Sequence, residues 1–120
     1  MTRVALDAKS ITRIAVEGLQ DTKGRDIVRM DLRKSSGAVT DFFIICTGTS
    51  DTHVKSLAES VMKKMSENGE KPISREGVQK GEWVLIDYGN VVIHIFLKES
   101  RMFYRLEDLW GDADFLHIPD

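Results

Sequence analysis

Features that would place the protein outside the cell or in a membrane are scarce in the sequence. Cysteine occurs once in 120 residues, at Cys46, so no disulfide can form within the chain, which is typical of a reducing compartment. No apolar run approaches the ~20 residues that a bilayer-spanning helix needs. The N-terminus also lacks the charged-then-apolar plan of a signal peptide. We therefore expect a cytoplasmic protein with no membrane contact.

Positive charge is also scarce. Lys and Arg number 17 against 19 Asp and Glu, which gives a formal net charge of −2. Proteins that hold nucleic acid by its phosphates usually present a dense basic face, so we expect no direct DNA binding. A mildly acidic protein can still act on a nucleoprotein particle by binding a basic protein within it.

The clusters that metal or nucleophile chemistry needs are missing. No two of His53, His94 and His117 have ligand spacing, and a zinc site needs three or four convergent ligands. Ser50 and His53 lie three residues apart at the start of a predicted helix, where N-capping accounts for both. We expect no metal, no cofactor and no catalytic residue.

The residues that are present predict one α/β (α+β) domain with a mixed sheet of about five strands and helices mainly on one face. Hydrophobic residues make up 42% of the chain, which is ordinary for a globular domain. Helical spacing predicts helices at 7–20 and 52–67, with one or two short helical pieces at 100–110. Asp7 or Thr2 would cap the first helix, and Ser50 or Thr49 the second. Strands are predicted at 26–33, 39–47, 71–76, 83–88 and 91–97, before an acidic tail at 114–120 that docks or stays loose.

The stretch 83–97 is the centre of this organisation. Two runs rich in Val, Ile and aromatic residues flank Gly89-Asn90, which suits a tight two-residue hairpin turn. Because side chains alternate along a strand, the hairpin has two different faces. One is a core face by composition, with Tyr88 at its turn end, and it carries Val84, Ile86, Val91, Ile93 and Ile95. The other is too apolar for open water and too polar for a sealed core, and it carries Trp83, Leu85, Asp87, Val92, His94 and Phe96.

A strand, the turn Gly48-Thr49-Ser50 and a helix start together resemble the phosphate-binding corner of nucleotidyltransferases. Those enzymes also need paired carboxylates to hold magnesium against the triphosphate. The later strands offer Asp87 alone, with no second acid across from it. Nucleotidyl transfer is therefore not expected, and a vestigial nucleotide-binding domain stays as an alternative.

Aromatic and acidic side chains gather on the second hairpin face and the C-terminal helical segment. The rings are those of Trp83, His94, Phe96, Tyr104 and Trp110, and the acids are Asp87, Glu107, Asp108, Asp112 and Asp114. An aromatic centre with a charged rim is typical of a protein-binding surface, here for a partner with a basic patch. Two other interpretations stay open: the C-terminal helices, in which Phe103, Leu106 and Trp110 share a stripe, cover this face, or two copies of the chain pair through it.

Three segments resemble the ribosomal silencing factor (Iojap) family in order and spacing. They are DFFIICTGTSDTHV at 41–54, WVLIDYG with VIHIF between 83 and 96, and YRLEDLWGDA at 104–113. The resemblance assigns residues 1–113 to a ribosomal silencing factor domain. It implies a mixed α/β fold related to nucleotidyltransferases but without their catalytic acids, and no enzymatic activity.

The resemblance also implies a partner. Members of this family bind the large ribosomal subunit through its ribosomal protein fourteen, so that the small subunit cannot join and translation is repressed. Organellar relatives act in large-subunit assembly, which is the alternative role. The residues expected to bind the partner are Trp83, Leu85, Asp87, Tyr88, His94, Phe96, Tyr104, Glu107, Asp108 and Trp110.

Overall fold

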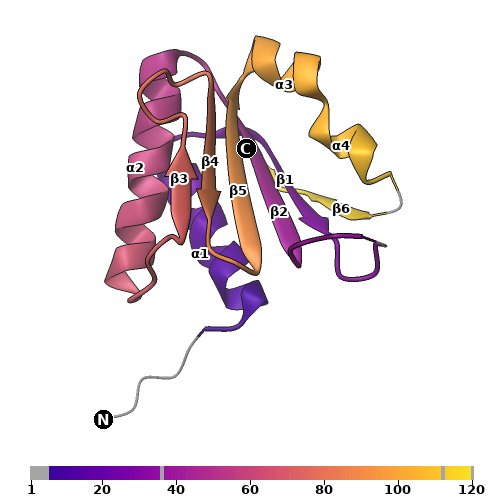
Figure 1. Ribbon diagram of the computed structural model, residues 1–120. Coiled ribbons are helices and arrows are strands. Elements are labelled where there is room, and N and C mark those ends of the chain that lie inside the picture. The colour runs from indigo at the N-terminus through magenta and orange to yellow at the C-terminus, as the bar shows by residue number, and fades with distance from the viewer. Residues whose placement is uncertain (1–5, 36, 112, 120) are drawn as a thin grey trace.

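A six-stranded mixed sheet forms the centre of the computed structural model, which describes residues 6–35, 37–111 and 113–119 (Figure 1). The helices are α1 (Ala8–Asp21), α2 (Asp51–Glu67), α3 (Lys98–Tyr104) and α4 (Leu106–Leu109). The strands are β1 (Arg25–Asp31), β2 (Phe42–Gly48), β3 (Ser74–Glu76), β4 (Trp83–Asp87), β5 (Val91–Leu97) and β6 (Asp114–His117). Apart from β6, each element overlaps a segment predicted from the sequence.

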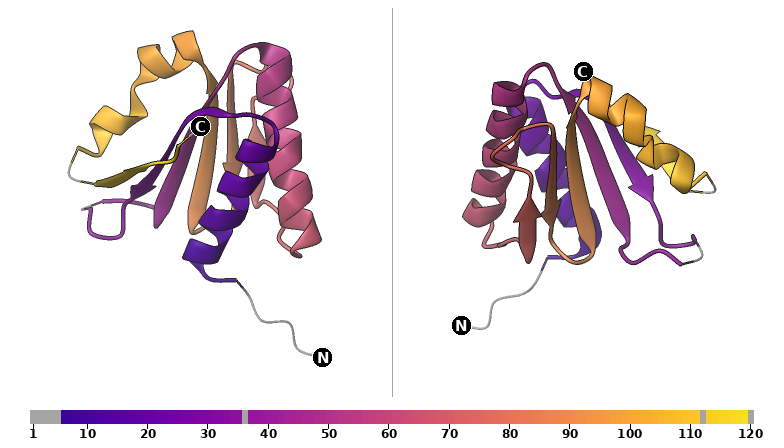
Figure 2. Two further views of the ribbon diagram at one scale, coloured as in Figure 1. Left: turned by 180° about the vertical axis from the view of Figure 1, so that it is seen from behind. Right: turned by 45° about the horizontal axis from the view of Figure 1, so that its top comes forward.

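The strands are arranged in the order β3-β4-β5-β2-β1-β6. Strands β2 and β5 at the centre run parallel, and the other neighbouring pairs run antiparallel. Helices α1 and α2 lie on one face of the sheet, while α3 and α4 lie on the other, as the two views in Figure 2 show. The predicted mixed sheet, with its two long helices on one face, is confirmed.

Both long helices begin at capping residues that the sequence predicted. The carboxylate of Asp7 accepts a hydrogen bond from the backbone N–H of Ser10 at 2.8 Å. The hydroxyl oxygen of Ser50 accepts one from the backbone N–H of His53 at 3.0 Å. Each cap satisfies a donor that the first turn of a helix leaves unpaired, which fixes where the helix starts.

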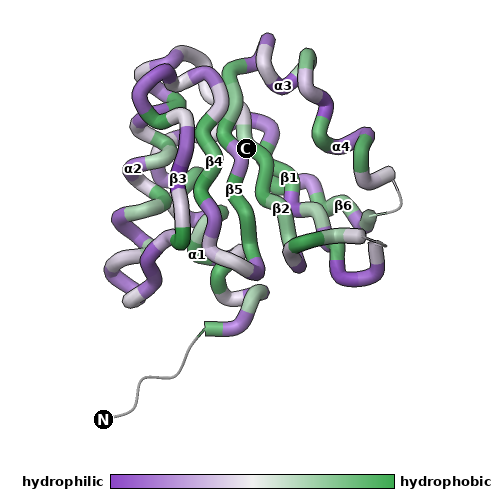
Figure 3. The backbone as a smooth tube through the Cα atoms, in the orientation of Figure 1, coloured by the Kyte–Doolittle hydropathy of each residue, from purple (hydrophilic) through white to green (hydrophobic). Residues whose placement is uncertain are grey.

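The main core lies between the sheet and the two long helices. The two-residue hairpin turn predicted at Gly89-Asn90 is confirmed, because Trp83 pairs with Phe96, Leu85 with His94 and Asp87 with Val92. Its core face is fully buried at Val84, Ile86, Val91, Ile93 and Ile95. Figure 3 shows the same pattern as a hydrophobic band through β4, β5 and β2.

The prediction of about five strands was one strand short, because residues 114–117 form β6. This strand pairs antiparallel with β1, and the backbone N–H of Ile118 donates to the carbonyl of Ile27 at 2.9 Å. All four residues of β6 are exposed and lie in an acidic segment. The sequence there therefore lacks the alternation of apolar and polar residues from which a half-buried strand is predicted. Its place comes from the outer edge of β1, whose backbone groups need partners.

Candidate protein-binding surface

The sheet face opposite α1 and α2 is only partly covered by the two short helices. Phe96 is fully buried there, and it belongs to a second core cluster against which Leu106 and Trp110 pack. Internal cover therefore applies to the part of this face over β1, β2 and β5. The part over β4 is different, because Leu85 and Asp87 are only half-buried.

An aromatic stack marks the border between the covered and uncovered parts. The half-buried ring of Trp83 stacks on Phe96, with 4.9 Å between the ring centroids. Tyr104, which is 48% exposed, reaches down from α3 to within 4.5 Å of the same indole ring. We call Trp83, Leu85, Asp87 and Tyr104 together the β4 surface. It combines aromatic, aliphatic and carboxylate groups in one accessible place, the composition expected of a protein contact.

His94 lies beneath the β4 surface instead of on it. Only 4% of His94 is exposed, and its Nδ1 accepts a hydrogen bond from the indole Nε1–H of Trp83 at 3.1 Å. The ring of Phe43 packs edge-on against it, 4.7 Å away between centroids. Burial lowers the pKa of His94 to about 4, while the nearby carboxylate of Asp87 acts weakly in the opposite direction. The ring is therefore neutral at pH 7, with its proton on Nε2.

Two of the acids expected at the rim, Glu107 and Asp108, have ion-pair partners within the chain, and Asp112 lies outside the described residues. Glu107 lies 3.5 Å from the guanidinium of Arg101, and Asp108 forms a 2.8 Å ion pair with Arg105. One carboxylate oxygen of Asp87 accepts from the backbone N–H of Gly89 at 2.7 Å, which holds the side chain at the hairpin turn. Asp87 is thus the acid that the β4 surface presents without an ion pair among the described residues.

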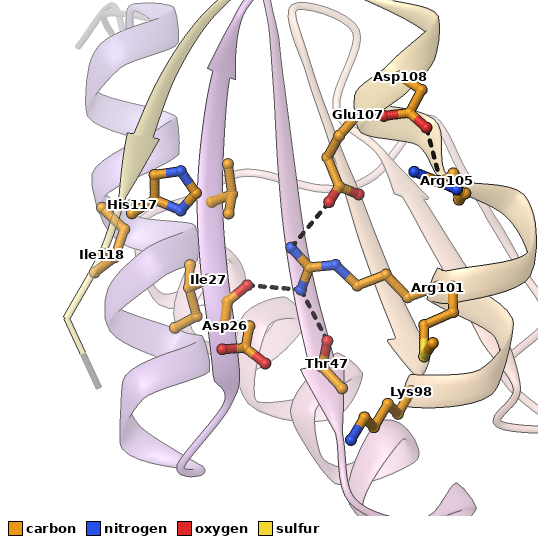
Figure 4. Close-up of a pocket in the computed structure, with 12 residues that line it drawn as sticks. Asp26, Ile27, Thr47, Lys98, Arg101, Arg105, Glu107, Asp108, His117 and Ile118 are labelled. Carbon is orange, nitrogen blue, oxygen red and sulfur yellow. Dashed lines mark hydrogen bonds and ion pairs between the residues drawn. The ribbon is translucent and has the colours of Figure 1, made fainter.

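Arg101 anchors α3 to the end of the sheet beside a crevice of about 730 Å³ (Figure 4). Its Nη1 donates to the backbone carbonyl of Asp26 at 2.7 Å and to the hydroxyl of Thr47 at 2.8 Å. Lining acids and bases balance, since Lys98, Arg101 and Arg105 face Asp26, Glu107 and Asp108. The charges that line the crevice therefore favour neither an anionic nor a cationic ligand. Arg101 acts as a clamp that holds α3, and with it Tyr104, in place.

The structure does not bring all the expected residues together. Tyr88 lies on the helix-covered face, 8% exposed, with a buried hydroxyl that has no partner among the described residues. Burial there raises its pKa to about 12. Glu107, Asp108 and Trp110 lie on or just after α4, away from β4. The expected residues that do converge are Trp83, Leu85, Asp87 and Tyr104, with His94 and Phe96 beneath them.

Sequence reasoning missed the exposed apolar side chains of the short helices. Met102 is 66%, Phe103 80% and Leu109 69% exposed. The expected stripe of Phe103, Leu106 and Trp110 was wrong, because Arg105 adopts a left-handed conformation with φ of 47° and interrupts the helical spacing. Arginine rarely adopts this conformation, so no signal in the sequence marks the break.

The chain was compared with known proteins. The profile of the family described as "Ribosomal silencing factor during starvation" matches residues 5–120. This chain belongs to the ribosomal silencing factor family. It is 41% identical over 108 residues to the ribosomal silencing factor of Bacillus subtilis, covering 90% of this chain and 91% of the relative. It is 37% identical over 83 residues to the chloroplastic protein Iojap of Zea mays, covering 67% of this chain and 35% of that protein.

Solved structures agree with this family assignment. A crystal structure from Chromobacterium violaceum superposes with a TM-score of 0.84 at 40% identity, covering 88% of both chains. A second, from Bacillus halodurans, has a TM-score of 0.79 at 34% identity, covering 92% of this chain and 99% of that one. The family name describes a regulatory factor that acts on ribosomes and not an enzyme.

The corner after β2, which resembles a phosphate site, uses its polar groups internally in this family member. The backbone N–H of Thr49 donates to Nδ1 of His53 at 2.9 Å, and Ser50 caps α2. The described residues contain no group of three or more His, Cys, Asp or Glu placed to hold a metal ion. Within the same residues, none of the helices is long and apolar enough to cross a membrane.

Proposed function

We propose that this chain binds the large ribosomal subunit through ribosomal protein fourteen of that subunit and represses translation by blocking entry of the small subunit. The observation that carries the proposal is the β4 surface, an accessible aromatic and aliphatic patch beside a carboxylate that has no ion pair among the described residues. Membership of the ribosomal silencing factor family indicates that the target is the ribosome. The β4 surface is the part of the chain best suited to bind a basic protein there.

Apolar burial would supply most of the affinity. Trp83 and Leu85 are half-buried in the free protein, so docking would cover the rest of both side chains. Complete burial of a large apolar side chain contributes about 1.5–3 kcal/mol, and the remaining half of each contributes about 1 kcal/mol. Asp87 would face a basic side chain of the partner, which adds orientation and association rate more than affinity.

The block itself would be steric and would need no reaction. The described chain measures 46 × 33 × 26 Å along its principal axes. A body of this size on the face where the subunits meet would occupy space that the small subunit must enter. On this account the factor works in the cytoplasm, by occupancy alone.

Asp87→Lys tests the proposed surface directly. It places a cation against the basic partner, so we expect binding to isolated ribosomal protein fourteen to weaken at least tenfold. The matched control is Glu67→Lys, the same charge change at the exposed end of α2 on the other side of the sheet. Equal binding by wild type and Asp87→Lys would remove the β4 surface from the proposal.

Self-association is a second candidate role, favoured by the exposed side chains of Met102, Phe103 and Leu109. Apolar groups that project from a short helix gain by pairing with a second copy. Light scattering across a concentration series checks this: a dimer should dissociate in Phe103→Ser, and a monomer at every concentration would rule the role out.

A further inference from the structure

The hydrogen bond between Trp83 and His94 joins an accessible side chain to an enclosed one. Trp83 contributes a half-buried ring to the β4 surface, while His94 is almost completely shielded. The two residues lie on neighbouring strands, and the 3.1 Å bond from Nε1 to Nδ1 crosses between them. Stacking on Phe96 holds the plane of the indole ring, but a half-turn about the Cβ–Cγ bond keeps that plane and moves the N–H to the opposite edge. The bond to His94 selects one of these two orientations.

We propose that His94 is a positioning residue for the β4 surface: its Nδ1 fixes the orientation of Trp83 that the ribosomal partner meets, while His94 stays out of contact. This inference rests on the proposed function, and it extends that function to a residue outside the contact. A side chain held in its bound orientation loses less freedom on docking, which raises affinity without a new contact.

The surroundings of His94 keep it in the accepting form. Phe43 and Ile45 approach from β2, and Leu85 lies opposite on β4. The carboxylate of Asp87 on β4 raises the pKa of His94, against the larger effect of burial. Burial dominates and favours the neutral ring, so Nδ1 remains an acceptor across the physiological pH range. The orientation of Trp83 therefore stays the same across this pH range.

Two substitutions at this position separate the acceptor from the bulk of the ring. In His94→Leu the side chain has similar volume but accepts nothing, and the indole N–H of Trp83 is released. In His94→Asn the amide oxygen takes nearly the position of Nδ1 and accepts the same hydrogen bond. Ile86→Val on the helix-covered face is the matched control, since it lowers stability in the same hairpin without touching Trp83.

Binding to purified large ribosomal subunits is the first readout. We expect His94→Leu to bind roughly three- to tenfold more weakly, because the released Trp83 side chain must then be ordered on docking, with affinity restored in His94→Asn. Trp83→Phe keeps the stacked ring but has no N–H, so His94→Leu should add no further loss in that background. Losses that add in the double variant, or equal loss in Ile86→Val, would overturn the positioning role.

The indole N–H resonance of Trp83 is the second readout, and it needs no ribosome. We expect slow hydrogen exchange in wild type and His94→Asn and fast exchange in His94→Leu, with the resonance assigned from its absence in Trp83→Phe. Unchanged exchange in His94→Leu would refute the positioning even if the subunit binds. If wild type does not bind the subunit while the exchange rates differ as expected, the proposed function fails and the positioning of Trp83 stands.

Discussion

Mild acid should destabilise the fold through His94. Its pKa is lowered from 6.5 to about 4 by burial, so between these values the unfolded chain binds a proton that the folded chain does not. The free energy of unfolding therefore falls as the pH is lowered through 6.5 towards 4. Two-state linkage with these values gives a loss of about 2 kcal/mol between pH 7 and pH 5.

Urea unfolding of wild type and His94→Asn at pH 7, 6 and 5 measures this loss. All other residues are the same in both proteins, so their contributions cancel in the difference. Arg33 lowers the pKa of Asp31 from 3.8 to about 2, so the loss of that stabilisation falls below the interval measured. The free energy of unfolding of wild type, relative to that of His94→Asn, should fall by about 2 kcal/mol from pH 7 to pH 5. A difference that stays the same at all three pH values would show that His94 is not buried as a neutral ring.

Three further changes have expected outcomes. Tyr88→Phe removes a buried hydroxyl that has no partner in the described part of the chain, so calorimetry should show equal or higher stability, by up to about 1 kcal/mol, with ribosome binding unchanged. Gly77→Ala sets a Cβ against the carbonyl of Trp83 at a φ of +79°, so it should lose about 1–3 kcal/mol in urea unfolding and weaken ribosome binding. Arg101→Met removes the hydrogen bonds that hold α3, so it should lower the free energy of unfolding by about 1.5–3 kcal/mol and speed amide exchange in α3. As the control, Arg105→Met at an exposed position should change the free energy of unfolding by less than about 0.5 kcal/mol.

The hairpin was predictable because its determinants are local. Gly89 and Asn90 allow one tight turn, and a two-residue turn fixes which residues pair across the strands. The alternation of side chains then separates the core face from the face of Trp83. Local reasoning also gave Asp7 and Ser50 among two candidate caps for each helix, because a cap is determined by the residues next to it.

The covered and uncovered parts of the second face were not predictable, since they depend on contacts between distant parts of the chain. His94 and Asp87 share that face by alternation, yet one is buried and the other half-exposed. The rings of Phe43 and Trp83 enclose His94, and Trp83 is in turn covered by Tyr104 of α3, which Arg101 holds by bonding to Asp26 and Thr47. Neither partner is adjacent to Arg101 in sequence, so no local pattern predicts these contacts.

Binding of the chain to the large subunit should prevent the two subunits from joining. Gradient sedimentation of mixed large and small subunits with increasing amounts of the factor measures this block. We expect the factor to migrate with the large subunit while the peak of joined particles declines, and we expect Asp87→Lys neither to migrate with the large subunit nor to reduce that peak. A peak of joined particles that persists when the large subunits are saturated with factor would contradict the steric block.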